Sequence, residues 1–418
     1  MNLKALILGA VITSATGFAF QPSPSHRSFE TSLHAKKILL AFDGTGNNAR
    51  DFAPSPDDDK SFTNVLKLHL HAGGSINGNV GNPFDDQISL YERGIGGKTY
   101  SELLSALRIA GGDLSKQTKP MRKRLEQIYE PGDQLYLLGF SRGSAAARNF
   151  AVELNQKGLR TKYGEKVQDP PIEFLGCFDT VSMQVKKRLI KILKARRKHL
   201  TTASTVLREN GKISPSIKKA VHILSLDDNR QWATPMCFPP VLMGDEERVH
   251  EVWVPGEHGD AGGNFYTKGL PDGACQHMKE FMEEAGLKFV EKAEDIKPEC
   301  LHIKVWGEKD IQVKNEDLII NPDPSDKLHW NEAVQIPTDT YTPSYRPVYV
   351  AENDELKEGA KVKIHESVLL HMEAQKKEGK KYLVNPKLKD TDFVVVGSLG
   401  KELESETKRL AELLKSDY

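Results

Sequence analysis

A serine flanked by two glycines stands where an apolar run gives way to small residues. Ser141 lies between Gly139 and Gly143, after the apolar run 135–140 and before Ser144 and three alanines. This pattern predicts a buried strand, a sharp turn and a closely packed helix, the setting in which a serine hydroxyl leaves an α/β sheet to attack a carbonyl. Ser141 is therefore the candidate nucleophile, and the alternative is an ordinary strand-to-helix connection.

A serine hydroxyl needs a base within reach to take its proton, and a carboxylate to orient that base. Asp179 follows a predicted strand at 171–178, and His258 follows another at 249–254. Serine, then acid, then histidine is the chain order of α/β-hydrolases. We therefore expect His258 to accept the proton of Ser141 and Asp179 to orient His258.

The oxyanion of a tetrahedral intermediate needs two or more backbone N–H donors. One donor is expected from Arg142, the residue after the candidate nucleophile. The glycine-rich loop that follows a predicted strand at 36–42 is the natural source of the others. We expect them at Gly44 and Thr45, because a glycine lets the backbone approach a substrate closely.

Each triad role has an alternative. Asp179 could instead cap a helix N-terminus, because an aspartate before an apolar stretch is a common start signal. Asp260 could orient the base in its place. His365 is the main rival of His258, since a late histidine after the last strand is the usual hydrolase arrangement.

Asp43 opens a second reading of the first loop. The segment 42–45 resembles the Asp-x-Asp-Gly-Thr motif of aspartyl-phosphatases, in which the first aspartate is the nucleophile. Ala41 stands at that first position here, so the sequence disfavours phosphoryl transfer through an aspartyl-enzyme.

Strand-like and helix-like segments alternate through the middle of the chain, which predicts an α/β fold with a mostly parallel central sheet covered by helices on both faces. In such sheets reactive groups gather beyond the carboxyl ends of the strands. The four candidate residues Asp43, Ser141, Asp179 and His258 each follow a different predicted strand. The predicted strands are 36–42, 86–93, 135–140, 171–178, 221–226 and 249–254.

The N-terminus has the layout of a targeting segment. Lys4 precedes the apolar stretch 5–12 and small residues follow, as in a signal peptide. A polar, Ser- and Arg-containing segment comes next and resembles the two-part presequence of algae with plastids inside the secretory system. An ordinary secretory signal with a linker explains it equally well. We expect entry into the secretory pathway, ending outside the cell, in the endomembranes or in a complex plastid.

The remaining boundaries follow from composition. Residues 1–36 form the presequence, 37–290 the catalytic domain with a basic helical insert at about 182–220, and 291–418 a C-terminal extension of the same domain with a charged tail. Within the insert, residues 185–200 carry eight Lys and Arg and no acid, on an amphipathic pattern. Such a helix can touch an anionic membrane peripherally or pack on its own domain.

Bulk composition narrows the partners. The 418 residues hold 58 basic and 58 acidic side chains, so nothing global favours a nucleic-acid partner. Four scattered cysteines show no metal-ligand spacing and no disulfide framework. We therefore expect no metal site at the cysteines, and the serine chemistry above predicts a small-molecule or lipid ester as the substrate.

Six segments, in this order, resemble the signature of an uncharacterised α/β-hydrolase domain family found in phospholipase effectors of bacterial type VI secretion. The resemblance covers roughly residues 37–290. It implies an α/β-hydrolase fold, a Ser–Asp–His triad, cleavage of phospholipid acyl esters and no cofactor. The segments are 42–47, 63–65, 91–96, 139–143, 178–181 and 254–263.

The sequence therefore predicts a serine hydrolase that cleaves a carboxylic ester, with (phospho)lipid acyl esters first among the candidates. Members with lipase activity carry extra membrane-facing modules, and this chain offers only the basic segment and an unfamiliar tail. A non-catalytic lipid- or protein-binding module on the same scaffold, and a thioesterase or peptidase with the same triad, stay open as alternatives.

Overall fold

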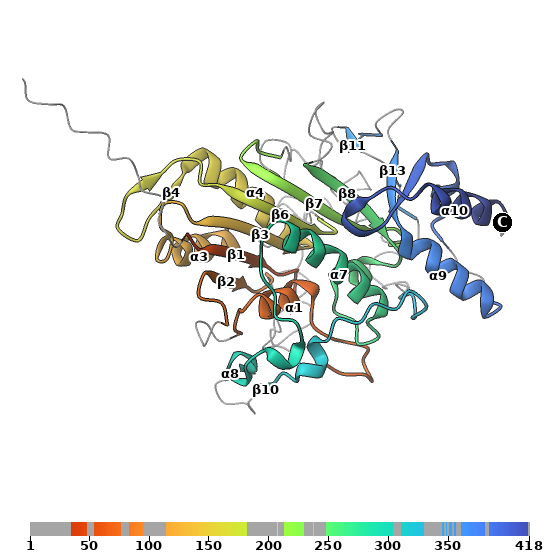
Figure 1. Ribbon diagram of the computed structural model, residues 1–418, viewed down its shortest axis with the longest axis horizontal. Helices are drawn as coiled ribbons and strands as arrows, with labels where there is room; N and C mark the ends of the chain where they lie inside the picture. Colours follow the sequence, from red (N-terminus) through yellow and green to blue (C-terminus); the bar gives the residue numbers. More distant parts are fainter. Residues whose placement is uncertain are drawn as a thin grey trace, which may run out of the picture.

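The computed structural model places an eight-stranded sheet at the centre of the molecule (Figure 1). It describes residues 35–47, 54–76, 83–95, 114–181, 207, 213–229, 237, 248–303, 311–329, 345, 346, 348, 351, 352, 355, 356, 361–380 and 384–416. The predicted presequence up to residue 34 and the basic segment 185–200 lie outside these residues, so both stay predictions.

All eight strands of the sheet run parallel, in the order β14-β13-β8-β7-β6-β3-β1-β2. The predicted α/β fold with a parallel sheet is therefore confirmed, and all six predicted strands are present. The strands are β1 (Lys37–Phe42), β2 (Gln87–Glu92), β3 (Gln134–Phe140), β6 (Ile172–Phe178), β7 (Ile217–Ser225), β8 (Val249–Val254), β13 (Val362–His365) and β14 (Phe393–Val396).

The chain reverses its direction of travel across the sheet at β1. From β1 it moves outward to β2, then returns to β3 on the other side of β1 and continues in one direction to β14. The carboxyl ends of β1 and β3 therefore form a topological switch point, where α/β sheets open a crevice for ligands. The first loop and Ser141 lie at this point of the fold.

Helices cover both faces of the sheet, as predicted. Those on one face pack around Met121, Leu125 and Phe150, and those on the other pack around Val65, Leu68 and Met278. Right-handed crossovers explain part of this division, because the β1–β2 connection runs opposite to the next two. The first face carries α3 (Ser115–Glu126) and α4 (Arg142–Lys157), and the second carries α1 (Asn64–His71) and α7 (Gly269–Glu284).

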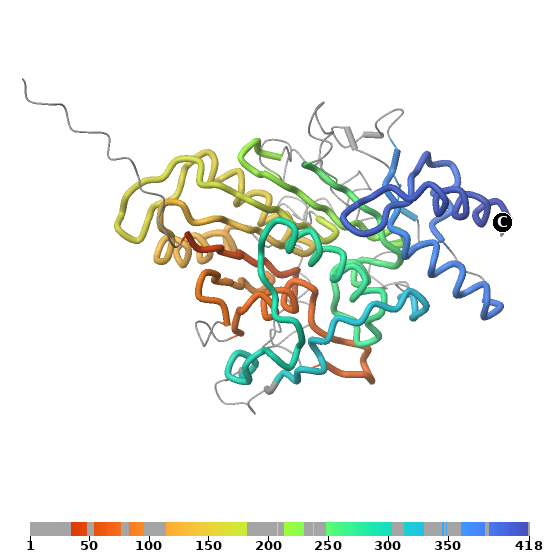
Figure 2. Tube along the Cα trace, viewed as in Figure 1, coloured from red at the N-terminus to blue at the C-terminus, as the bar shows by residue number. Residues whose placement is uncertain are grey.

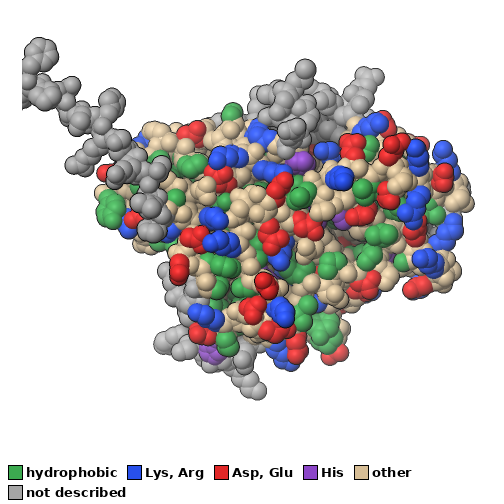
Figure 3. All heavy atoms as spheres, viewed as in Figure 1, with side chains coloured by type: hydrophobic (Ala, Val, Ile, Leu, Met, Phe, Trp, Pro, Cys, Tyr) green, Lys and Arg blue, Asp and Glu red, His purple; other side chains and the backbone are tan. Residues whose placement is uncertain are grey.

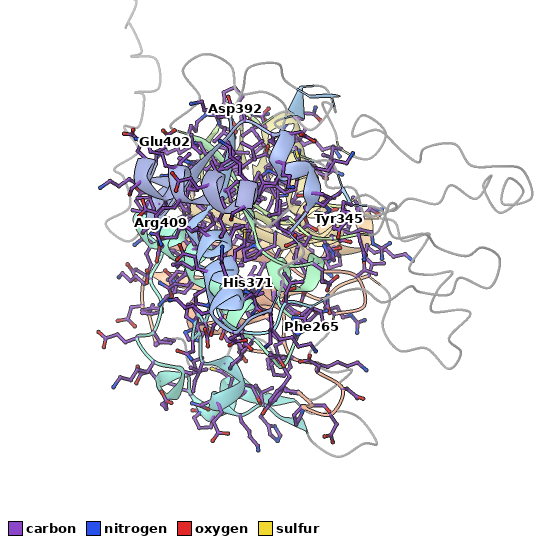
Figure 4. All side chains as sticks on the ribbon, turned by 90° about the vertical axis from the view of Figure 1, so that its right-hand side faces the viewer. Phe265, Tyr345, His371, Asp392, Glu402 and Arg409 are labelled. Atoms are coloured by element: carbon purple, nitrogen blue, oxygen red, sulfur yellow. The ribbon has the colours of Figure 1, made fainter. Side chains whose placement is uncertain are left out.

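Residues 361–380 and 384–416 extend the same sheet with β13 and β14, and these segments lie together at one end of the molecule, drawn in blue in Figure 2. Their apolar side chains, among them Leu369 and Leu410, pack in one cluster with Leu224 of β7 and Trp253 of β8. Figure 4 looks onto this end, where Arg409 of one helix forms an ion pair with Glu373 of the other. These helices are α9 (Glu366–Lys377) and α10 (Glu404–Ser416).

Shorter helices and three separate strand pairs lie outside the central sheet. They are α6 (His258–Gly262), α8 (Pro298–Leu301) and the strand pairs β4 (Leu159–Arg160) with β5 (Lys166–Val167), β9 (His302–Ile303) with β10 (Ile311–Gln312), and β11 (Ala351–Glu352) with β12 (Glu355–Leu356). None of the helices in the described ranges combines the length and the apolar composition needed to cross a bilayer. On the face drawn in Figure 3 basic and acidic side chains are interspersed, in keeping with their equal numbers.

Candidate active site

Ser141 occupies a strained turn between β3 and α4. Its backbone angles are φ 58° and ψ −124°, a left-handed region that a residue with a side chain rarely adopts. Its N–H donates to the carbonyl of Phe178 at the end of β6, over 2.9 Å. The turn is thus held by the neighbouring strand, as the predicted nucleophile turn requires.

The two flanking glycines allow this turn to close. A Cβ on Gly139 would lie 2.6 Å from the carbonyl oxygen of Gly143, and a Cβ on Gly143 would lie 2.2 Å from that of Phe42. Both distances are shorter than van der Waals contact, and both neighbours are backbone that cannot rotate away. The first turn of α4 therefore packs directly on the ends of β1 and β3.

Gly143→Ala is expected to destabilise the protein by at least the ~1–3 kcal/mol typical of overpacked sites, because backbone must move to admit the methyl group. Gly273→Ala is the matched control, since a Cβ there meets nothing within 4 Å in the middle of α7. That change should instead add about 0.5–1 kcal/mol of helix stability. Urea unfolding measures both, and equal midpoints for the two variants would contradict the close approach.

Asp179 follows β6 and is completely buried. One of its carboxylate oxygens lies 2.7 Å from Nη1 of Arg346, and the other lies 3.3 Å from Nη2. The N–H and the hydroxyl of Ser225, the last residue of β7, each donate to this carboxylate over 3.2 Å. Burial alone would raise the pKa of Asp179, but Arg346 and His258 hold it well below 3.8. Asp179 is therefore an ionised carboxylate with a fixed orientation.

His258 begins α6 and points one ring nitrogen at Asp179. Its Nδ1 lies 2.5 Å from Oδ2 of Asp179. An ionised carboxylate only accepts hydrogen bonds, so Nδ1 must carry the proton of this contact. In the neutral ring Nε2 is then the nitrogen that can accept a proton, which is the tautomer a general base needs.

The ring of His258 also lies beside the turn that holds Ser141. Its centroid is 4.6 Å from that of Phe140, the residue directly before Ser141. The side chain of His258 is 14% exposed and Ser141 is 6% exposed. The loops after β3, β6 and β8 thus bring Ser141, Asp179 and His258 to one place at the carboxyl edge of the sheet.

His365, the rival base, lies at the other side of this edge. It ends β13, and four strand-to-strand steps separate β13 from β3, or about 19 Å at about 4.8 Å a step. Its Nδ1 caps α9 through Ser367, and it lines a cavity of about 180 Å³ together with His277. Neither Ser141 nor Asp179 lines that cavity. Burial lowers the pKa of His365 well below 6.5.

Asp260 is paired with a different histidine. Its Oδ1 lies 2.5 Å from Nδ1 of His329, and its Oδ2 accepts the N–H of Glu257 over 2.9 Å. Nε2 of His329 contacts Asp59 over 3.0 Å. Burial alone would lower the pKa of His329, but the carboxylates of Asp260 and Asp59 raise it. Asp260 therefore anchors the short helix that begins with His258 rather than orienting that ring.

Asp43 organises the first loop. Its carboxylate accepts hydrogen bonds from the N–H of Gly44 over 2.7 Å, from Thr63 over 2.9 Å and from Tyr91 over 2.5 Å. Burial raises its pKa to about 6, although these three bonds oppose the shift. With these donors around it and 1% of its surface exposed, Asp43 is a structural acceptor here rather than a nucleophile.

The hydrogen bond from Gly44 to Asp43 contradicts the expectation that the N–H of Gly44 is an oxyanion donor. The N–H of Gly44 points at Asp43, so in this structure it is committed to that carboxylate. Thr45 is tied to α4 because its hydroxyl accepts a hydrogen bond from Nε of Arg142. The loop after β1 and the first turn of α4 are therefore linked at Thr45 and Arg142.

Sequence reasoning missed Arg346 and Asp228. Nη2 of Arg346 lies 2.7 Å from Oδ2 of Asp228, and ligand atoms of Asp228, Asp179 and His258 lie within 4.8 Å of one another. Such a group could hold a metal ion by distance alone, but the guanidinium of Arg346 already binds both carboxylates. Asp228 follows predicted strand 221–226, so its position was a usable signal, whereas nothing near Arg346 marked it.

Comparison with known proteins matches residues 36–282 to one family. The family described as "T6SS, Phospholipase effector Tle1-like, catalytic domain" matches residues 36–169 and 160–282, more than half of the chain. The uncharacterized protein YEL023C of Saccharomyces cerevisiae is 27% identical over 270 residues, which are 51% of this chain and 35% of that protein.

Two solved structures also resemble the chain. An uncharacterized protein from Pseudomonas aeruginosa is 19% identical with a TM-score of 0.37, over 61% of this chain and 46% of that one. The Tle1 effector bound to the VgrG spike from the type VI secretion system is 21% identical with a TM-score of 0.36, over 56% of this chain and 52% of that one. The chain therefore spans about a third to a half of the length of these relatives.

Proposed function

Since the chain belongs to the family of Tle1-like phospholipase effector catalytic domains, we propose that it is a serine hydrolase that cleaves the acyl esters of lipids, phospholipids first among them. One observation carries the proposal. The His258–Asp179 pair, 2.5 Å apart, lies beside the strained turn that presents Ser141.

In the first half of the reaction Oγ of Ser141 attacks the ester carbonyl carbon while its proton passes to Nε2 of His258. The imidazolium that forms is stabilised by the negative charge of Asp179. Collapse of the tetrahedral intermediate breaks the bond to the alcohol, which leaves with the proton from His258. The acyl group stays on Ser141.

In the second half water attacks the acyl-enzyme, with His258 again taking and returning a proton, and the fatty acid is released. The oxyanion formed in each half needs backbone donors. We assign these to the N–H groups of Thr45 and Arg142, because the contact between their side chains places the two segments together.

The substrate class is tested with vesicles of a phospholipid carrying two different acyl chains. The proposal predicts release of one fatty acid for each lysophospholipid formed, which mass spectrometry quantifies. Activity on short water-soluble p-nitrophenyl esters alone would support the proposed hydrolase activity but contradict the proposed lipid substrate. Release of a phosphorylated headgroup would contradict acyl-ester cleavage, because a serine–histidine triad of this kind attacks carbonyl carbon.

We also propose that residues 1–36 direct the protein into the secretory pathway. The support is the order of charge, apolar stretch and small residues noted above. A fluorescent protein fused after residue 36 should follow that route, and a cytosolic distribution of the fusion would contradict it.

A further inference from the structure

A residue from beyond the family match reaches the catalytic aspartate. The match ends at residue 282, yet Arg346 binds Asp179 through both terminal nitrogens and Asp228 through one. All three side chains are at least 99% buried. Figure 4 marks Tyr345, the residue before Arg346 in the chain.

The backbone of Arg346 is itself held in place. Nδ2 of Asn385 donates to the carbonyl oxygens of Arg346 over 2.9 Å and of Leu226 over 2.8 Å. The N–H of Asn385 donates to Asp227, whose other oxygen accepts the N–H of Gly256 over 2.8 Å, two residues before His258. The C-terminal segments thus connect Arg346 to the ends of both β7 and β8.

Charge gives this contact a chemical consequence. Asp179 and Asp228 are two buried carboxylates whose oxygens lie within 4.8 Å of one another. Two like charges this close cannot both stay ionised without a counter-charge. Arg346 is that counter-charge, and it stays protonated at any pH the protein experiences. With Arg346 present the three side chains carry one net negative charge beside His258, as a single triad aspartate would.

We propose that Arg346 is a positioning residue of the active site, which orients Asp179 and balances the charge of Asp228 so that one negative charge supports His258. The inference rests on the proposed function. It also makes the C-terminal third a working part of the catalytic site.

The test is a double-mutant cycle on the rate at which a fluorophosphonate labels Ser141. Arg346→Met should slow labelling by about 100-fold, less than the ~10⁴-fold cost of replacing a triad carboxylate by an amide. Asp228→Asn removes the charge that Arg346 balances, so the double variant should recover at least about 10-fold of that loss. A merely structural role predicts that the two changes slow labelling independently or worse.

Arg248→Met is the matched control, because Arg248 binds the backbone carbonyls of Ser214 and Ile217 at the amino-terminal ends of the strands, away from the site. Its labelling rate should stay near that of the wild type. Wild-type labelling by Arg346→Met, or no recovery in the double variant, would overturn the proposal.

A second readout does not depend on turnover. Isotope-labelled aspartate carboxyl signals, with that of Asp179 assigned by Asp179→Asn, should show no titration of Asp179 above about pH 4 in the wild type. In Arg346→Met the pKa of Asp179 should rise into the observable range. If the pKa of Asp179 rises in Arg346→Met but the fluorophosphonate does not label even the wild type, the proposed hydrolase function is contradicted and the proposed charge balance by Arg346 is supported. An unchanged titration of Asp179 in Arg346→Met would contradict the proposed charge balance by Arg346.

Discussion

Ser141→Ala is expected to lower kcat/KM for ester hydrolysis by about 10⁴- to 10⁶-fold, because no other group then forms the acyl-enzyme. The turn itself should survive, since its contacts involve backbone atoms: the N–H of Ser141 bonded to Phe178, and the glycines that admit α4. The variant should therefore unfold at nearly the wild-type urea concentration. Labelling by a fluorophosphonate should disappear.

Ser144→Ala is the matched control. Ser144 lies in the first turn of α4, is fully buried, and donates its hydroxyl to the carbonyl of Phe178 over 3.0 Å. Losing that hydrogen bond should cost about 1 kcal/mol of stability and leave labelling intact. If Ser141→Ala is still labelled, or if folded wild-type protein is not labelled at all, Ser141 is not the nucleophile.

The parts of the site that could be predicted from sequence are those with local signals. A buried strand that ends in a polar residue is readable in one segment, and this signal located Ser141, Asp179 and His258 at or just after strand ends. The structure adds what such a signal omits. It places His365 in a cavity that neither Ser141 nor Asp179 lines.

The contacts that sequence reasoning missed join residues far apart along the chain. Arg346 and Asp179 are 167 residues apart, and His329 and Asp260 are 69 apart. Arg346 and His329 stand in or beside stretches rich in Pro, Asp and Ser, a composition that indicates turns but names no partner. Their roles depend on buried charge, and only the assembled fold shows which carboxylate each one neutralises.

Supporting residues of the motifs have structural roles that explain their place beside the site. The side chain of Asn64 donates to the carbonyls of Ala261 and Pro271, one in α6 and the other in α7. Thr63, directly before it, donates to Asp43 of the first loop. This pair of residues therefore connects the loop after β1 to the short helix that begins with His258.

His258→Ala is expected to slow acylation by about 10⁴-fold or more, because it removes the group that takes the proton from Ser141. His365→Ala should leave the rate within a few-fold of wild type and cost about 1 kcal/mol of stability, since that ring caps α9. The rate of fluorophosphonate labelling and urea unfolding separate the two effects. Added imidazole, which fits the space left by the ring, should restore part of the rate in His258→Ala alone. The reverse pattern, with His365 essential and His258 dispensable, would require His365 to leave the N-terminus of α9 and its cavity, which neither Ser141 nor Asp179 lines.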